Sequence, residues 1–120
     1  MSESIKAFQK YRERMNAEIL SCGHLGIKRF FALDHDAYQG GALPSKTKEL
    51  LGLVASVILR CNDCITYHLI QCHKEKVTDQ ELQEALNVAL IVGGSITIPH
   101  LRKAFEVWGE LKEKEKESRA

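Results

Sequence analysis

The sequence predicts an all-α domain of about six helices. Only two prolines, Pro44 and Pro99, interrupt its 120 residues, and runs of alternating β-branched residues are few. Apolar residues instead recur at spacings of three and four along most of the chain, which is the periodicity of an amphipathic helix. The length fits one domain over residues 1–120. A hydrophobic fraction of 44% with 28% charged residues is enough to build a core and argues against disorder.

The first two predicted helices occupy about residues 3–38. In the segment 3–20 one stripe at helical spacing collects most of the apolar residues, and Gly23 follows at a position where a left-handed residue commonly ends a helix. The members of that stripe are Ile5, Phe8, Arg12, Met15 and Ile19. A second, shorter helix runs from about Leu25 to Tyr38 and ends before Gly40-Gly41. Its apolar residues are Ile27, Phe30, Phe31 and Ala37.

The third helix is opened by Pro44-Ser45 and carries an unusually broad apolar face. That face consists of Leu50, Leu51, Leu53, Val54, Val57 and Ile58. Such a face predicts a central helix that is buried on most sides. Because a small domain buries little surface by itself, we also expect a homo-oligomer interface to complete the core.

Capping residues place the last three helices. Asn62 and Asp63 are good N-caps, so the fourth helix begins within the segment 61–64 and ends near Lys74. Thr78 and Glu81 form a capping box at the start of the fifth helix, which ends at Gly93-Gly94. Its inward residues are Leu82, Ala85, Leu86 and Ala89.

Pro99 suits the first turn of a sixth helix. Its stripe is Leu101, Phe105, Trp108 and Leu111, and the charged tail 112–120 should be a solvated, fraying end.

Charge and hydropathy exclude several classes of function. The 17 basic and 16 acidic residues leave a net charge of +1, so we expect no nucleic-acid partner. The longest apolar run, residues 50–59, is about half the length of roughly 20 residues that a membrane-spanning helix needs. The first residues lack the apolar segment of a signal peptide, so we expect a cytoplasmic protein.

The chain contains four cysteines, Cys22, Cys61, Cys64 and Cys72. In a short secreted chain this even number would indicate a disulfide scaffold. Without a secretory signal it favours metal or redox chemistry. We expect Cys22 and Cys72 to be small buried apolar residues, because that is the commonest role of a lone cysteine.

Cys61 and Cys64 form a Cys-x-x-Cys pair, a spacing that allows a short-loop disulfide and places both sulfurs on one face of a helical turn. At a helix N-terminus, unpaired N–H groups and the helix dipole favour a thiolate over a thiol. His68 follows Cys64 by four residues and therefore shares this face, which continues to Cys72. An imidazole there can exchange a proton with the thiol or stabilise its anion.

A zinc site is the sharpest alternative for this face. Cys61, Cys64, His68 and Cys72 are suitable ligand types. Four ligands on about three turns of one helix cannot easily surround a metal, so a second helix would have to contribute. The chain has no second Cys-x-x-Cys pair to provide it.

Glu49, in the first turn of the third helix, has two possible roles. It either complements the positive end of the helix or acts as a partly buried carboxylate that relays a proton to the cysteine pair. Periodicity alone does not choose between these roles. The other histidines (His24, His35, His73 and His100) and Tyr67 are expected to have surface, core or structural roles.

Three segments together resemble the carboxymuconolactone decarboxylase superfamily and, more narrowly, its AhpD-like alkylhydroperoxidase branch. They are residues 44–56, which include Glu49, residues 61–68, which include both cysteines and His68, and residues 78–90. The resemblance covers about residues 43–108. Its specific element is a Glu, a Cys-x-x-Cys twelve residues later, and a His four residues after the second Cys.

The resemblance implies an AhpD-like fold of helical hairpins that assembles as a homo-oligomer, commonly a trimer or hexamer. It also implies that Cys64 is the peroxidatic cysteine, that Cys61 is the resolving and more accessible one, and that Glu49 and His68 belong to a proton relay. Asp63 departs from the family, whose best-characterised members carry a histidine between the cysteines. Its negative charge opposes thiolate formation, which bears on the efficiency of peroxide reduction.

We therefore expect an enzyme that reduces hydroperoxides through Cys64 and Cys61. An external dithiol, either a lipoyl group or a thioredoxin-like protein, would then reduce the resulting disulfide. No metal or organic cofactor is expected. The alternatives are a disulfide reductase or redox relay without a physiological peroxidase role, a carboxymuconolactone decarboxylase-like protein of other activity, and a non-enzymatic helical oligomerisation or metal-binding module.

Overall fold

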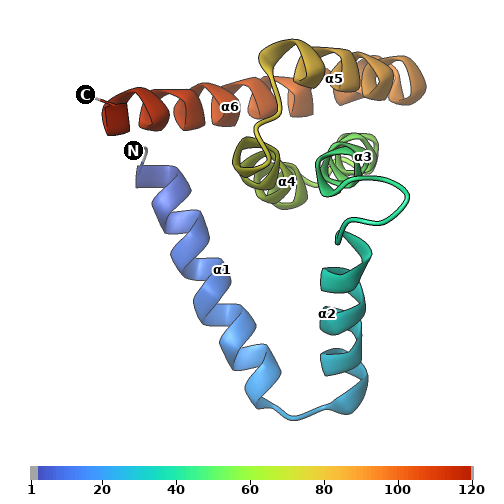
Figure 1. Cartoon of the computed structure of the whole chain (residues 1–120), viewed down its shortest axis with the longest axis vertical. Helices are drawn as coiled ribbons and strands as arrows, with labels where there is room; N and C mark the ends of the chain where they lie inside the picture. Colours follow the sequence, from blue (N-terminus) through green and yellow to red (C-terminus); the bar gives the residue numbers. More distant parts are fainter. Residues whose placement is uncertain (1–2, 120) are drawn as a thin grey trace.

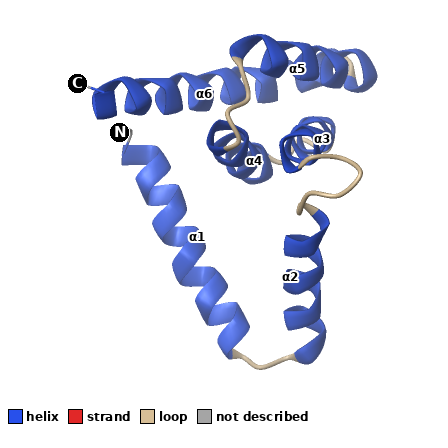
Figure 2. Cartoon of the chain, viewed as in Figure 1, coloured by secondary structure: helices blue, strands red, loops and turns tan. Residues whose placement is uncertain are grey.

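The computed structural model describes residues 3–119, with side chains described for 4–117. Over this range every regular element is helical, as predicted, and there is no β-strand (Figure 2). The α-helices are α1 (Glu3–Ser21), α2 (Leu25–Ala37), α3 (Ser45–Ile58), α4 (Asn62–Lys74), α5 (Asp79–Gly93) and α6 (Ile98–Arg119). A short 3₁₀ turn, η1 (Ser95–Thr97), precedes α6 and was not predicted.

The helices form a packed part and a projecting arm (Figure 1). In the packed part α3 lies against α4 and α5, and α4 lies against α6. Helices α1 and α2 open as a V on the far side of α3 and α4, so that residues 3–37 form an arm that extends away from α5 and α6. The site described below lies where this arm meets α4.

The core lies between α3, α4, α5 and α6. Its buried apolar residues include Leu53, Val57, Ile65, Leu69, Leu82, Leu86, Ala104, Val107 and Leu111. Two predictions about this core were wrong for the single chain. Leu51 is 55% exposed and Phe105 is 48% exposed, because α3 and α6 each bury one narrow stripe instead of a broad face. On α6 the inward position is occupied by Ala104, one residue before Phe105.

The arm contributes little to the core. Ile5 is its buried apolar residue, and α2 has no buried residue at all. The apolar side chains of α2 are instead solvent-facing in the single chain, with Phe30 68% exposed and Leu33 67% exposed. No helix in the described part of the chain combines the length and apolar character needed to cross a membrane.

A tight turn joins α3 to α4 and determines where the cysteine pair lies. Arg60 takes a left-handed conformation with φ +60°, the N–H of Cys61 donates to the carbonyl of Ser56 at 3.0 Å, and the N–H of Arg60 donates to the carbonyl of Val57 at 3.0 Å. These two bonds are a Schellman motif, which ends α3. Cys61 then serves directly as the N-cap of α4. The cysteine pair therefore lies at the first turn of α4, close to the end of α3.

The predicted capping box of α5 is confirmed. The Thr78 hydroxyl accepts from the N–H of Glu81 at 3.1 Å, and the Glu81 carboxylate accepts from the N–H of Thr78 at 2.8 Å. Asp79 then ties α5 to α6, because its carboxylate accepts from the Trp108 indole at 2.8 Å and from Lys112. These hydrogen bonds lower the pKa of Asp79. Residues 112–119 of the charged tail remain helical as the end of α6.

Candidate functional site

Cys61 and Cys64 form a disulfide at the N-terminus of α4, with their Cα atoms 5.3 Å apart. As the N-cap residue, Cys61 accepts a hydrogen bond through its sulfur from the backbone N–H of Cys64, at 3.2 Å. An N–H group aimed at a sulfur stabilises negative charge on it, and the helix dipole acts in the same direction. The helix N-terminus therefore favours the thiolate of Cys61 once the disulfide is reduced.

The two cysteines differ in accessibility, and the expectation for Cys61 was wrong for this chain. Cys64 is exposed and lines a cavity, whereas Cys61 is only partly exposed. The reason is local, since an N-cap side chain folds back over the end of its own helix. Cys64 lies one turn later and lines the cavity between α4 and the arm.

Behind the cysteines, Glu49 of α3 and His68 of α4 form a buried pair. Their residues are 5% and 8% exposed, and the distance from Glu49 Oε1 to His68 Nδ1 is 2.9 Å. A carboxylate has no hydrogen to donate, so Nδ1 is the donor in this bond. In the neutral imidazole Nε2 is then left as an acceptor. The prediction that Glu49 lies in the first turn of this helix was wrong, because α3 begins at Ser45 and its first turn has no acidic residue. The structure instead places Glu49 one turn further, against His68.

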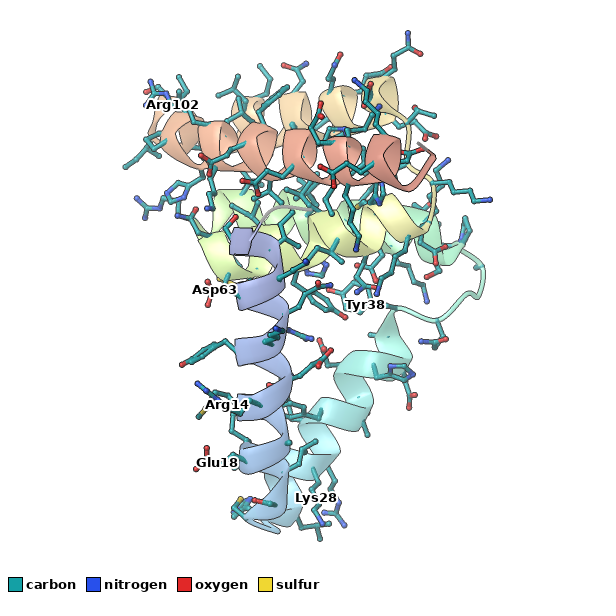
Figure 3. All side chains as sticks on the ribbon, turned by 90° about the vertical axis from the view of Figure 1, so that its left-hand side faces the viewer. Arg14, Glu18, Lys28, Tyr38, Asp63 and Arg102 are labelled. Carbon is teal, nitrogen blue, oxygen red and sulfur yellow. A yellow bond between two sulfur atoms is a disulfide. The ribbon has the colours of Figure 1, made fainter. Side chains whose placement is uncertain are left out.

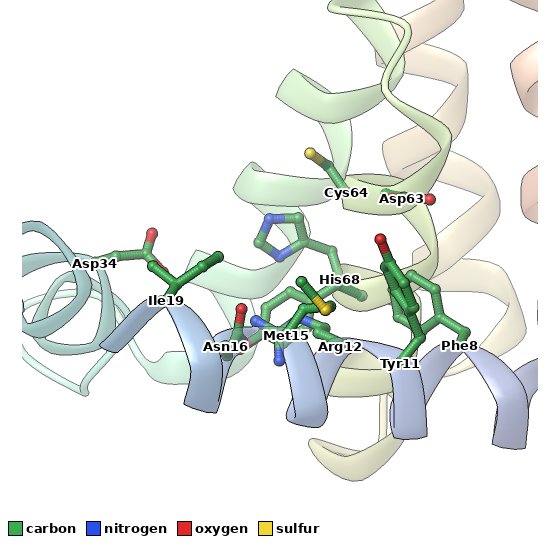
Figure 4. A pocket seen from close by; sticks show the side chains of 11 residues that line it. Phe8, Tyr11, Arg12, Met15, Asn16, Ile19, Asp34, Asp63, Cys64 and His68 are labelled. Atoms are coloured by element: carbon green, nitrogen blue, oxygen red, sulfur yellow. The ribbon is translucent and has the colours of Figure 1, made fainter. Parts of the chain in front are cut away.

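A cavity of about 470 Å³ separates Cys64 from the arm (Figure 4). Cys64 and His68 line its α4 side together with Tyr67 and Asp63. The other lining residues come from the arm and are Phe8, Tyr11, Arg12, Met15, Asn16, Ile19 and Asp34. Most of the apolar stripe predicted for the first helix therefore lines this cavity, while Ile5 is buried in the core and Phe8 also packs against it.

Three charged side chains border the cavity, and the sequence did not predict that they would lie there. The Arg12 guanidinium lies over the Tyr67 ring, 3.9 Å from its centroid, and it lowers the pKa of that phenol against the larger, raising effect of burial. The carboxylates of Asp34 and Asp63 also line the cavity. The only sequence signal was Arg12 itself, a cation at a position where the helical stripe is otherwise apolar.

Tyr38, the C-cap of α2, is a further site residue that sequence reasoning missed. Its hydroxyl lies 3.5 Å from His68 Nε2, the ring nitrogen that does not contact Glu49. Figure 3 shows this residue where α2 reaches α3 and α4. Burial raises the pKa of Tyr38, and the negative charges of Asp34 and Glu49 raise it further. No local pattern pointed to Tyr38, because its partner lies thirty residues later in the chain.

The remaining two cysteines lie in contrasting surroundings. Cys72 is fully buried, as predicted, and burial raises the pKa of its thiol to about 12, with smaller contributions from Glu49 and Glu75. Cys22 is exposed, so the prediction that it is buried was wrong. It follows the last residue of α1 at the far end of the arm, where the described chain places no core around it.

Cys72 is expected to resist alkylation in the native protein. A thiol with a pKa of about 12 stays protonated at pH 8, and it is also sterically covered. Exposed Cys22 should react with iodoacetamide at least roughly 100-fold faster than Cys72 under these conditions. Mass spectrometry of the alkylated peptides measures the two rates, and denatured protein is the control in which both should react. Equal native rates would contradict the buried placement of Cys72.

The other histidines have structural partners. His24 is the N-cap of α2 and accepts from the N–H of Ile27, His73 pairs with Glu115 at 3.2 Å, and His100 contacts Asn62 at 2.8 Å.

Across residues 3–119 no three side chains of the His, Cys, Asp or Glu types are grouped so that they could hold a metal ion.

Comparison with known proteins places this site in a family context. The sequence pattern of the carboxymuconolactone decarboxylase family matches residues 27–107, which contain both cysteines, Glu49 and His68. A protein from Cupriavidus necator is 31% identical over 75 residues, an alignment that covers 62% of this chain and 66% of that protein. The match therefore spans slightly less than two thirds of that relative's length.

Crystal structures extend the similarity to almost the whole chain. A Thermotoga maritima protein is 54% identical with a TM-score of 0.91, over 93% of this chain and 98% of that one. A second structure from the same organism, at 53% identity and a TM-score of 0.90 over 95% and 97% of the two chains, is described as a carboxymuconolactone decarboxylase family protein with a possible involvement in an antioxidative response. A family member from Legionella pneumophila is 28% identical with a TM-score of 0.83, over 92% of this chain and 98% of that one.

Proposed function

Because the chain belongs to the carboxymuconolactone decarboxylase family, we propose that it is a thiol-dependent peroxidase of the AhpD-like branch. The observation that carries the proposal is the placement of the Cys61–Cys64 disulfide at a helix N-terminus, with the Glu49–His68 pair on the adjoining buried face. The description of the Thermotoga maritima relative, with its possible antioxidative role, is consistent with it.

Cys64 is the peroxidatic residue in this proposal, because it is exposed and borders the cavity that His68 also lines. Its proton passes to His68, and the resulting thiolate attacks the terminal oxygen of a hydroperoxide. The S–O bond forms as the O–O bond breaks, and the leaving alkoxide takes a proton to become an alcohol. Cys64 is thereby oxidised to a sulfenic acid. Glu49 accepts the hydrogen bond of Nδ1 and stabilises the imidazolium while His68 holds the proton.

Cys61 resolves the sulfenic acid. The N–H of Cys64 that contacts its sulfur favours the thiolate. This thiolate attacks the Cys64 sulfur, so that the S–S bond forms, the S–O bond breaks and the oxygen leaves as water after protonation. One thiolate of an external dithiol, such as a lipoyl group or a thioredoxin-like protein, then attacks the exposed Cys64 sulfur and expels the Cys61 thiolate, which leaves a mixed disulfide on Cys64. The second thiolate of the dithiol attacks its own sulfur in this mixed disulfide and expels the Cys64 thiolate. The dithiol leaves as a disulfide, and its two electrons and two protons restore both cysteines to thiols. No metal or organic cofactor takes part, and the cycle requires a reducing compartment such as the cytosol.

Steady-state consumption of cumene hydroperoxide, with dihydrolipoamide as the reductant, tests this function. Turnover that depends on both the hydroperoxide and the dithiol supports the peroxidase. Rapid exchange with protein or small-molecule disulfides, without turnover of the hydroperoxide, would instead support a disulfide reductase or redox relay that uses the same cysteines.

We also propose that the chain works as a homo-oligomer, a trimer or hexamer, in which a second copy covers the apolar face of α2. The support is the apolar surface of α2, which has no buried residue in the single chain although Leu25, Phe30 and Leu33 are large and exposed. Apolar area of this extent on one helix is unusual for a monomer. Burying each such side chain stabilises an interface by about 1.5–3 kcal/mol.

Light scattering during gel filtration is expected to give a mass of three or six times the 13.6 kDa of the chain. Phe30→Glu places a charge on the exposed face of α2 and should shift the protein to smaller species. Gln83→Glu adds the same charge at an exposed position on α5 and is the matched control. A monomer mass for the unmodified protein at micromolar concentration would contradict the assembly.

A further inference from the structure

The Tyr38 hydroxyl contacts His68 at Nε2, and the proposed catalytic cycle assigns no function to this contact. We propose that Tyr38 is a positioning residue, which orients His68 and receives the Nε2–H hydrogen bond when the imidazole takes the proton of Cys64. The inference rests on the proposed roles of Cys64 and His68 and adds to the site a residue from a third helix.

The geometry surrounds the imidazole from both sides. Glu49 of α3 contacts Nδ1 at 2.9 Å and Tyr38, at the end of α2, contacts Nε2 at 3.5 Å. The rings of Tyr38 and His68 are 5.3 Å apart between centroids and inclined by 44°. The hydroxyl contact lies at the long end of hydrogen-bond distances. Three helices therefore meet at one imidazole.

Gly52 of α3 leaves the space in which this contact is made. A Cβ at this position would lie 2.6 Å from His68 Cε1, 2.9 Å from His68 Nε2 and 2.9 Å from the Tyr38 hydroxyl. A glycine within a helix costs roughly 1 kcal/mol relative to alanine. The helix therefore carries an unfavourable residue at the place where His68 and Tyr38 approach each other.

A tyrosine hydroxyl suits both states of His68. With Nδ1 donating to Glu49, the neutral imidazole accepts the Tyr38 O–H through Nε2. When the S–H bond of Cys64 breaks and the proton reaches Nε2, the new N–H donates to the Tyr38 oxygen, because a hydroxyl can rotate from donor to acceptor. The hydrogen bond to the charged imidazolium is the stronger of the two. Tyr38 thus favours the ion pair of thiolate and imidazolium.

Tyr38 itself stays protonated over the working pH range. The titratable groups around it come from α2, α3 and α4, and they are Asp34, His35, Glu49, Tyr67, His68 and Glu75. Burial of the hydroxyl, followed by the negative charges of Asp34 and Glu49, disfavours a phenolate and raises the pKa of Tyr38. Any pH dependence that Tyr38 confers therefore acts through His68 and Cys64.

The test is the pH profile of Cys64 alkylation by iodoacetamide, measured by mass spectrometry on the reduced full-length Cys61→Ser protein. Adding Tyr38→Phe should move the midpoint of the profile upward by about one pH unit, and the rate at pH 7 should fall several-fold, as expected for loss of one hydrogen bond to a charged group. Tyr38→Gln, which again offers a donor and an acceptor, should restore part of the shift.

Two further variants make the result specific. Gly52→Ala keeps the Tyr38 hydroxyl, but its methyl group would collide with both the His68 ring and that hydroxyl, so the two groups can no longer keep their contact. It should shift the profile in the same direction and serves if Tyr38→Phe does not fold. Trp108→Phe removes the 2.8 Å hydrogen bond to Asp79 between α5 and α6 and should leave the profile unchanged.

Superimposable profiles for the folded Tyr38→Phe or Gly52→Ala protein and its parent would overturn the role of Tyr38. Alkylation requires no peroxidase activity. A shifted profile in a protein that does not reduce hydroperoxides would therefore refute the proposed function and leave the role of Tyr38 standing.

Discussion

Replacing Cys64 with serine is expected to abolish dithiol-dependent hydroperoxide reduction, with a loss of at least roughly 10³-fold in kcat/KM. Cys64 provides the attacking sulfur, and a serine hydroxyl at this position remains protonated and is a much weaker nucleophile. The substitution changes one atom at an exposed position, so the fold should be retained. Consumption of cumene hydroperoxide with dihydrolipoamide measures the effect, and circular dichroism checks the fold.

Two matched variants separate the role of Cys64 from general thiol chemistry. Cys22→Ser removes the other exposed thiol and should leave turnover unchanged. Cys61→Ser should allow one round of peroxide reduction and then stop, with a sulfenic acid on Cys64 that dimedone traps. Turnover by Cys64→Ser equal to that of the unmodified protein would refute the peroxidatic role of this cysteine.

The second large effect is expected for Glu49→Gln, which should lower kcat/KM by about 100-fold, the size typical of a lost acid–base contribution. Glutamine keeps the size of the side chain and can still accept the Nδ1 hydrogen bond through its amide oxygen. It removes the negative charge that stabilises a protonated His68 inside a buried pair. The change should therefore affect the chemistry far more than the folding.

The structure offers a close control for this variant. Glu115 pairs with His73 at 3.2 Å, so the described chain has a second Glu–His contact, away from the cavity and partly exposed. Glu115→Gln should leave the hydroperoxide kinetics within about twofold of the unmodified protein, because a solvent-screened pair contributes little. Unchanged kinetics for Glu49→Gln would contradict the proton relay.

Most helix boundaries were predictable because their signals are local. The capping box at Thr78 and Glu81 satisfies the first N–H groups of α5 from residues three apart, and it appears in the structure as predicted. The start of α4 was predictable in the same way, although the cap proved to be Cys61 instead of Asn62 or Asp63. A cysteine sulfur is a weak acceptor, so propensity gave no reason to favour it.

The site was only partly predictable, because it is assembled by tertiary contacts. Spacing placed Cys64 and His68 on one helical face, but it could not decide whether Glu49 of another helix faces them. The resemblance to a family suggested that contact, and the structure brings Glu49 and His68 to 2.9 Å. Tyr38 contacts His68 from the end of α2. This contact depends on how α2 is placed relative to α4, and the periodicity of the sequence carries no information about that placement.

The direction in which α1 and α2 project was also beyond local reasoning. Amphipathic periodicity identifies an apolar stripe but not what the stripe faces. On α1 most of the stripe, from Phe8 to Ile19, lines the cavity beside Cys64. On α2 no residue is buried in the single chain, and Leu25, Ile27, Phe30 and Leu33 are exposed.

The most direct test is a single-turnover experiment on the fully reduced protein. One equivalent of cumene hydroperoxide is added, free thiols are then blocked, and tandem mass spectrometry identifies the oxidised residues. The peroxidase cycle predicts stoichiometric formation of the Cys61–Cys64 disulfide, with Cys22 and Cys72 still reduced. Hydroperoxide that persists while Cys61 and Cys64 stay reduced, or oxidation that falls on Cys22 instead, would contradict it.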